Sequence, residues 1–221
     1  MLVGRHGFPL ETIVMRWPLD PMTLMWIQVA TGAVGMLTLI HYWRMFLRKL
    51  GFVLDIKVFF SPKGGCTEAI LAELKKARHE VLVQAYSFTS DPITNMLVEL
   101  KKNGVEVDLV LDKSNELERY SELHVFIEHG LNPLVDHDHA IAHNKIIIID
   151  KRVVITGSFN FTNQAENENA ENLMIVRGHP ELVNWYRTNF FKHREHAKPA
   201  QIKEGEMKDR RPAAHAAPKA A

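Results

Sequence analysis

The stretch from Pro21 to Trp43 contains no Asp, Glu, Lys or Arg over 23 consecutive positions. Roughly 20 apolar residues in a helix are enough to cross the hydrocarbon core of a bilayer. Trp26 lies near one end of the stretch, and Tyr42 and Trp43 form the other, where aromatic rings anchor a helix at the membrane surface. The stretch therefore predicts an uncleaved membrane anchor at residues 21–43, preceded by a short segment at 1–20. A cleaved signal sequence and a buried core helix are the alternatives.

The basic residues around this stretch bear on its orientation. Four follow it and two precede it: Arg44, Arg48, Lys49 and Lys57 after, Arg5 and Arg16 before. Because cytoplasmic flanks of membrane helices are enriched in Lys and Arg, this excess favours a single-pass protein whose main domain is cytoplasmic. A signal sequence that is cleaved would reverse this and leave the domain periplasmic or secreted.

Short apolar runs alternate with segments of helical spacing between residues 51 and 196. The runs predict strands at 56–60, 81–88, 105–111, 131–135, 146–150, 153–156 and 172–176. The helical spacing predicts helices at 67–78, 91–102, 116–129 and 180–193. Such alternation is typical of an α/β domain whose sheet is covered by helices on both faces. The stretch 197–221, rich in Ala, Pro, Lys and Glu, predicts a disordered tail, and the lack of an internal repeat predicts one catalytic unit per chain.

The residues from His143 to Asn160 carry the chemistry of this domain. His143 and Lys145 are two apart at the start of a predicted strand, so their side chains share one face. Beyond the next strand, Gly157, Ser158 and Asn160 leave the sheet in a turn, where free backbone N–H groups and small polar side chains suit an anion. A nucleophile or base, a cation and amide donors in one place predict a site that handles phosphate.

The same residues resemble the HKD signature of the phospholipase D superfamily, which reads His-x-Lys, four residues, Asp, six residues, Gly-Ser-x-Asn. All six positions are filled, by His143, Lys145, Asp150, Gly157, Ser158 and Asn160. The segments 60–62, 85–89, 157–162 and 171–172 are similar to the small bacterial Nuc-type endonucleases, and the likeness extends over about residues 56–195. It implies an α-β-α sandwich with a mixed sheet.

This resemblance also implies a mechanism and a role for each residue. In the family a histidine attacks phosphorus to give a phosphohistidine, and a second histidine protonates the leaving oxygen and then activates water. A chain with one motif supplies only His143, so the resemblance implies a homodimer with its active site at the two-fold interface. Lys145, Ser158 and Asn160 would hold the phosphoryl oxygens, and Glu171 would orient the histidine ring or lie solvated in a loop. Asp150 and Gly157 are interpreted as structural.

We expect no cofactor and no catalytic metal, because Lys145 and the imidazoles can supply the electrostatic stabilisation. Mitochondrial single-motif relatives carry a Cys/His zinc insert, which a chain with the single cysteine Cys66 cannot build. His137 and His139 flank Asp138 and could hold a metal, although a surface loop is the simpler interpretation. His193 and His196 are assigned to the surface of the last helix, and Cys66 lacks a neighbouring base that would make it a nucleophile.

The motif leaves the substrate open. Likeness to the Nuc type favours an endonuclease acting on DNA or RNA. The predicted anchor favours a phospholipase D-type enzyme acting on membrane lipids such as cardiolipin or phosphatidylcholine. A non-catalytic dimeric membrane adaptor is the third hypothesis, which the intact motif disfavours.

Overall fold

The computed structural model describes residues 19–49, 53–118 and 121–201. The chain divides into two compact units, Met1–Phe46 and Leu47–Ala221, each described here by itself. The predicted segment at 1–18 and the predicted disorder from residue 202 onward lie outside the described residues.

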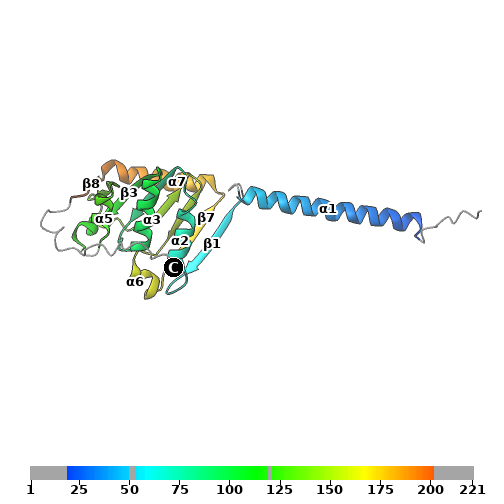
Figure 1. Cartoon of the computed structure of the whole chain (residues 1–221), viewed down its shortest axis with the longest axis horizontal. Helices are drawn as coiled ribbons and strands as arrows, with labels where there is room; N and C mark the ends of the chain where they lie inside the picture. The colour runs from blue at the N-terminus through cyan, green and yellow to red at the C-terminus, as the bar shows by residue number, and fades with distance from the viewer. Residues whose placement is uncertain (1–18, 50–52, 119–120, 202–221) are drawn as a thin grey trace, which may run out of the picture. The chain divides into compact units, whose positions relative to one another are not determined.

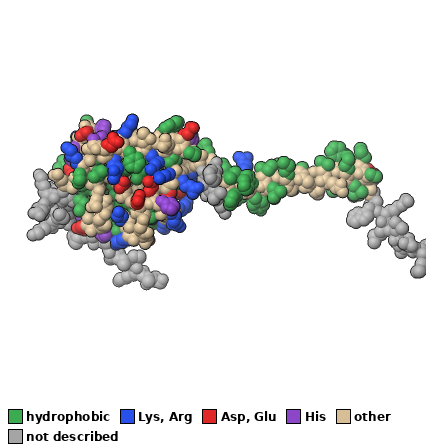
Figure 2. Space-filling model, turned by 90° about the horizontal axis from the view of Figure 1, so that it is seen from above, with side chains coloured by type: hydrophobic (Ala, Val, Ile, Leu, Met, Phe, Trp, Pro, Cys, Tyr) green, Lys and Arg blue, Asp and Glu red, His purple; other side chains and the backbone are tan. Residues whose placement is uncertain are grey.

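The first unit consists of helix α1, Pro21–Lys49. The side chains described for this helix, from Pro21 to Leu47, are exposed or partly exposed, and Leu37 and Leu39 are 66% and 73% exposed. Figure 2 shows hydrophobic side chains on the surface of the helix. By length and composition the part from Pro21 to Leu47 can cross a membrane.

The second unit is built on one sheet (Figure 1). Its strands, in chain order, are β1 (Asp55–Phe60), β2 (Glu80–Ala85), β3 (Glu106–Asp112), β4 (Leu134–Asp136), β5 (Lys145–Ile149), β6 (Val153–Gly157), β7 (Asn172–Arg177) and β8 (Lys198–Pro199). They lie in the order β1-β7-β6-β5-β2-β3-β4-β8. The pairs β2–β3 and β3–β4 are parallel and the other neighbours antiparallel, which confirms the mixed sheet.

The two faces of the sheet are covered by different helices. On β2, Val81 and Val83 point into a core formed with α2 (Cys66–Leu74), α3 (Asp91–Lys102) and α5 (Leu123–Glu128). Leu82, between them, points to the opposite face and packs in the cluster that contains Val183 and Phe190 of α7 (Pro180–His196). The alternation of side chains along a strand thus places helices on both faces, as the sequence predicts.

The predicted helix at 116–129 is wrong as a single element. The chain forms two short helices instead, α4 (Ser114–Leu117) and α5. The buried Asn115 amide donates to the carbonyls of Tyr86 and Asp112, at 2.6 and 3.0 Å, and Glu118 is extended with ψ of 118°. These tertiary hydrogen bonds outweigh the helical propensity of the segment.

Two further elements are absent from the sequence prediction. Helix α6, Asn163–Asn167, is only five residues long and begins at Thr162, whose hydroxyl accepts a hydrogen bond from the Ala165 N–H. Strand β8 pairs with β4, so the first residues of the predicted tail belong to the sheet. Both elements are too short for hydrophobic periodicity to reveal them.

Candidate active site

Apart from Asp150, the predicted site residues lie at one end of the sheet. Strands β1, β2 and β6 end there, and β5 and β7 begin there: Lys145 pairs with Ala85, Gly157 with Leu173, and Phe60 with Asn172. Because adjacent strands lie about 5 Å apart, residues that flank these ends come within reach of one another. The topology therefore brings together residues from His143 to Glu171, which the sequence separates.

Lys145 is the first residue of strand β5, and His143 lies two residues before it. His143 is exposed, whereas Lys145 is only 5% exposed. The Lys145 ammonium donates to the His143 carbonyl at 2.8 Å. Burial lowers the pKa of this ammonium, and the nearby carboxylate of Glu171 opposes that shift. A desolvated, rigidly placed cation next to an accessible imidazole is an arrangement that can bind and activate a phosphate.

Tyr86, directly after β2, contacts both of these residues. Its ring centroid lies 4.6 Å from that of His143 and 5.1 Å from the Lys145 Nζ. Tyr86 has no role in the sequence prediction, although an aromatic residue directly after a buried strand is a usable signal. Its ring restricts the orientations of the imidazole and shields one side of the cation.

The turn after β6 places Ser158 and Asn160. The Ser158 hydroxyl accepts from the backbone N–H and the side-chain amide of Asn172, at 3.0 and 3.2 Å. A Cβ on Gly157 would lie 2.2 Å from the Asn172 carbonyl oxygen, so only glycine permits this close approach of β6 and β7. Among the described residues the buried Asn160 Oδ1 has no hydrogen-bond partner, which leaves this amide available to a bound substrate.

Glu171 lies beside the site, just before β7. Its carboxylate accepts from the Asn169 side-chain amide at 3.2 Å, and its charge acts on Lys145. Its backbone is fixed through Ser61, which accepts from the Glu171 N–H at 3.2 Å. Orientation of His143 by Glu171 stays a prediction.

Asp150 lies at the opposite end of β5, in the turn to β6. Its carboxylate accepts three backbone N–H groups, from Arg78, His79 and Glu80, at 2.8, 2.8 and 3.0 Å. It therefore fastens the turn to the start of β2, away from His143, in keeping with the structural role expected from strand parity.

Cys66 does not contribute a nucleophile to this site. The side chain is fully buried at the start of α2. Burial raises the pKa of the thiol to about 11, with smaller contributions from Glu166, Glu68 and Glu171. The reactive thiolate is therefore scarce at neutral pH.

Comparison with known proteins agrees with this geometry. Residues 70–194 match the family described as "Cardiolipin synthase, PLD-like domain". The chain belongs to the phospholipase D superfamily. It is 39% identical over 137 residues to the "Phospholipase D" of Rickettsia typhi, covering 62% of this chain and 67% of that protein. It is 33% identical over 107 residues to human "Mitochondrial cardiolipin hydrolase", covering 48% of this chain and 42% of that protein.

The phospholipase D fold is also found in the solved relatives. The crystal structure of Nuc from Salmonella typhimurium, a phospholipase D family member, superimposes with a TM-score of 0.65 at 30% identity and covers 68% of this chain and 100% of that chain. The NucT structure from Helicobacter pylori has a TM-score of 0.62 at 19% identity, covering 66% and 99%, and supports the fold alone. As a phospholipase D superfamily enzyme the chain is a phosphoric diester hydrolase, which sets aside the non-catalytic adaptor.

Proposed function

We propose that this chain hydrolyses phosphodiester bonds through a phosphohistidine formed on His143. The observation that carries the proposal is the placement of an exposed imidazole beside the buried ammonium of Lys145. In the first half of the reaction His143 Nε2 or Nδ1 attacks phosphorus, the P–O bond breaks, and the leaving oxygen takes a proton from a second imidazole. In the second half that imidazole removes a proton from water, and the resulting attack on phosphorus breaks the P–N bond and frees His143.

We infer that the second imidazole is His143 of a partner subunit. The described part of one chain places one histidine, His143, in contact with Lys145 and Tyr86. An exposed apolar stripe supports a dimer: Ile56, Val58 and Phe60 of the edge strand β1 are 51%, 51% and 65% exposed. Phe60 pairs with Asn172, which holds Ser158, so the stripe ends beside the site. A second copy that covered the stripe would remove this apolar surface from water.

Nucleic acid is the substrate class we propose first. The catalytic unit covers all of the Nuc structure at 30% identity. The exposed position of His143 suits a polymer that passes across the end of the sheet. A membrane phospholipid is the second candidate, because α1 can tether the enzyme next to lipid and because relatives are named phospholipase D and cardiolipin hydrolase.

A direct comparison of substrates tests this order. The full chain in detergent should cleave single-stranded DNA or RNA and leave vesicles of cardiolipin or phosphatidylcholine intact. The matched control is the His143→Ala protein purified in the same way, which identifies any contaminating nuclease. Release of phosphatidic acid or a free head group, with nucleic acids intact, would show that the substrate is a membrane phospholipid. No hydrolysis of either class would contradict both.

We also propose that α1 remains in the mature protein as a single-pass tether with the catalytic domain in the cytoplasm. Its exposed apolar surface supports the tether. The basic residues after Trp43 support the cytoplasmic orientation. The full chain should stay in the membrane pellet after high-salt and carbonate washing, whereas a chain that begins at Leu50 should be recovered in solution. Carbonate extraction of the full chain, or a mature protein whose sequence begins after residue 43, would contradict the tether.

A further inference from the structure

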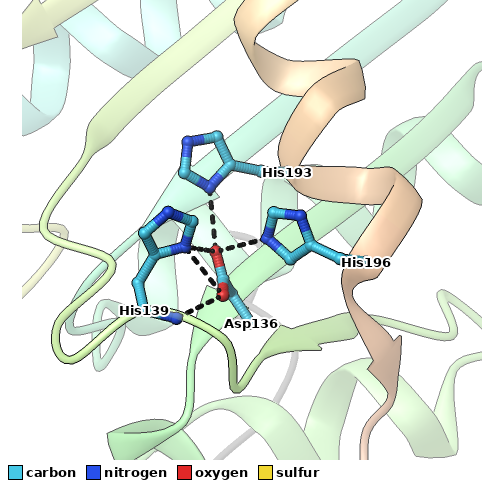
Figure 3. A group of neighbouring side chains, drawn as sticks. All are labelled: Asp136, His139, His193 and His196. Atoms are coloured by element: carbon cyan, nitrogen blue, oxygen red, sulfur yellow. Dashed lines mark hydrogen bonds and ion pairs between the residues drawn. The ribbon is translucent and has the colours of Figure 1, made fainter.

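Four side chains gather at the end of strand β4, apart from the catalytic residues (Figure 3). Asp136 ends the strand, His139 lies in the loop that follows, and His193 and His196 come from the last turn of α7. One potential ligand atom from each residue lies within 4.8 Å of all the others. The prediction that these histidines lie on the surface is wrong for His193, whose side chain is only 15% exposed beside the fully buried Asp136.

Three imidazole nitrogens converge on a single carboxylate oxygen in this cluster. Asp136 Oδ2 lies 2.9 Å from His139 Nδ1, 2.8 Å from His193 Nδ1 and 3.2 Å from His196 Nε2. The other oxygen, Oδ1, accepts the backbone N–H of Asp138 at 3.1 Å. The buried His196 Nε2 makes no hydrogen bond of normal geometry among the described residues. Hydrogen bonds alone therefore leave a polar atom unsatisfied at the centre of the cluster.

The donor set of the cluster suits a divalent metal ion, and its oxygen–nitrogen separations can be compared with those of a metal site. Tetrahedral zinc bound by nitrogen and oxygen at about 2.0–2.1 Å separates its ligand atoms by about 3.3 Å. The oxygen–nitrogen separations here, 2.8–3.2 Å, are close to that value. Three imidazoles with one carboxylate and no thiolate suit zinc and its neighbours in the first transition series, not calcium or magnesium. We propose that Asp136, His139, His193 and His196 form a tetrahedral binding site for zinc or a similar divalent cation.

The proposed ion has a structural role. Four protein ligands fill a tetrahedral shell and leave no open position for water or substrate. Two strands separate β4 from β5, so the ion lies about 15 Å across the sheet from Lys145. It fastens the end of α7, which covers one face of the sheet, to strand β4.

The same ion also holds the loop that leads to the catalytic strand. His139 precedes His143 by four residues, and two contacts hold the loop between them. The Lys113 ammonium donates to the His139 carbonyl at 2.9 Å, and the Ala142 N–H donates to Asp112 at 2.7 Å. The metal would complete this restraint at the start of the loop.

The test measures zinc bound to the full chain, purified in detergent without a histidine tag. Wild-type protein should bind one equivalent of zinc and should give the intense visible absorption of tetrahedral cobalt when Co²⁺ replaces it. His139→Ala and His193→Ala should each weaken zinc binding by at least about 10²-fold. The matched control is His137→Ala, because His137 adjoins the cluster but faces Glu116, with 3.4 Å between its Nε2 and the carboxylate.

Thermal unfolding gives a second readout that does not depend on activity. Zinc at about a hundred times its Kd should raise the Tm of wild-type and His137→Ala proteins by about 5–10 °C. The Tm of His139→Ala should not respond to zinc. Because the His139 side chain is 47% exposed, this variant should fold even if His193→Ala does not.

Three results would overturn the proposal. The first is wild-type protein that neither binds zinc nor gains thermal stability from it. The second is a His139→Ala variant that binds zinc as tightly as the His137→Ala control. The third concerns the role of the ion: if EDTA abolishes turnover in protein that stays folded, and zinc restores it, the metal is catalytic and not structural.

Discussion

Replacing His143 with alanine should reduce phosphodiester hydrolysis by at least about 10⁴-fold, because the covalent step loses its nucleophile. His143 is exposed, so its truncation removes no core contact and the variant should keep the Tm of the wild type. Activity is measured on whichever substrate class the wild-type protein cleaves.

Acid quenching identifies the intermediate directly. With substrate labelled at the phosphate, the wild-type protein should carry label that is stable in base and labile in acid, as expected of phosphohistidine. His143→Ala protein should carry none. Label that persists in the folded variant would show that another residue is the nucleophile.

Mixed dimers extend the same prediction to the partner subunit. Heterodimers of wild-type and His143→Ala chains, isolated with two different non-histidine affinity tags, have one imidazole where the reaction needs two. Loss of general acid–base catalysis alone costs about 10²–10⁴-fold, so these heterodimers should keep less than about 1% of wild-type turnover. Half of the wild-type activity in purified heterodimers, or full activity in a monomer, would contradict the shared site.

Replacing Lys145 with alanine should lower turnover by about 10²–10³-fold, as does removal of a preorganised group that stabilises a charged transition state. The nucleophile remains, so a slow phosphohistidine should still form. Lys145→Arg should recover little activity, because a planar guanidinium does not fit a buried position shaped by the Tyr86 ring.

Asp150→Asn is the matched control for Lys145→Ala within the same motif. Its carboxylate accepts three backbone N–H groups far from the phosphate site, so the substitution should lower the free energy of unfolding by about 1–3 kcal/mol. Turnover per folded molecule should stay within a few-fold of wild type. If folded Asp150→Asn protein is as inactive as Lys145→Ala, the assignment of roles within the motif is wrong.

The sequence predicted those features that depend on local pattern and strand parity. The two buried faces of β2 follow from Val81, Leu82 and Val83. Asp150 was expected to face away from His143 because an odd number of positions separates the two residues along the chain, and it lies just after the end of β5. The convergence of His143 and Lys145 with the turn after β6 was predicted because the motif spans two strands joined by a tight hairpin.

Features that depend on contacts between distant segments were missed. The break after α4 depends on Asn115, whose amide reaches the Tyr86 carbonyl in another part of the sheet. The cluster around Asp136 joins His139 to histidines more than 50 positions later, and helical spacing alone places His193 and His196 on a surface. Only the tertiary fold shows that this surface packs against the buried carboxylate of Asp136.

The buried position of Cys66 has a practical consequence for spectroscopy and labelling. A thiol with a pKa of about 11 is ionised to roughly one part in 10⁴ at neutral pH, against a few per cent for an ordinary cysteine. Maleimides react with the thiolate, so they should label the native chain only very slowly. A cysteine introduced at an exposed position such as Lys102 becomes the single reactive thiol in a wild-type background. An impermeant reagent at that position tests the proposed side of the membrane, and paired spin labels test the proposed dimer.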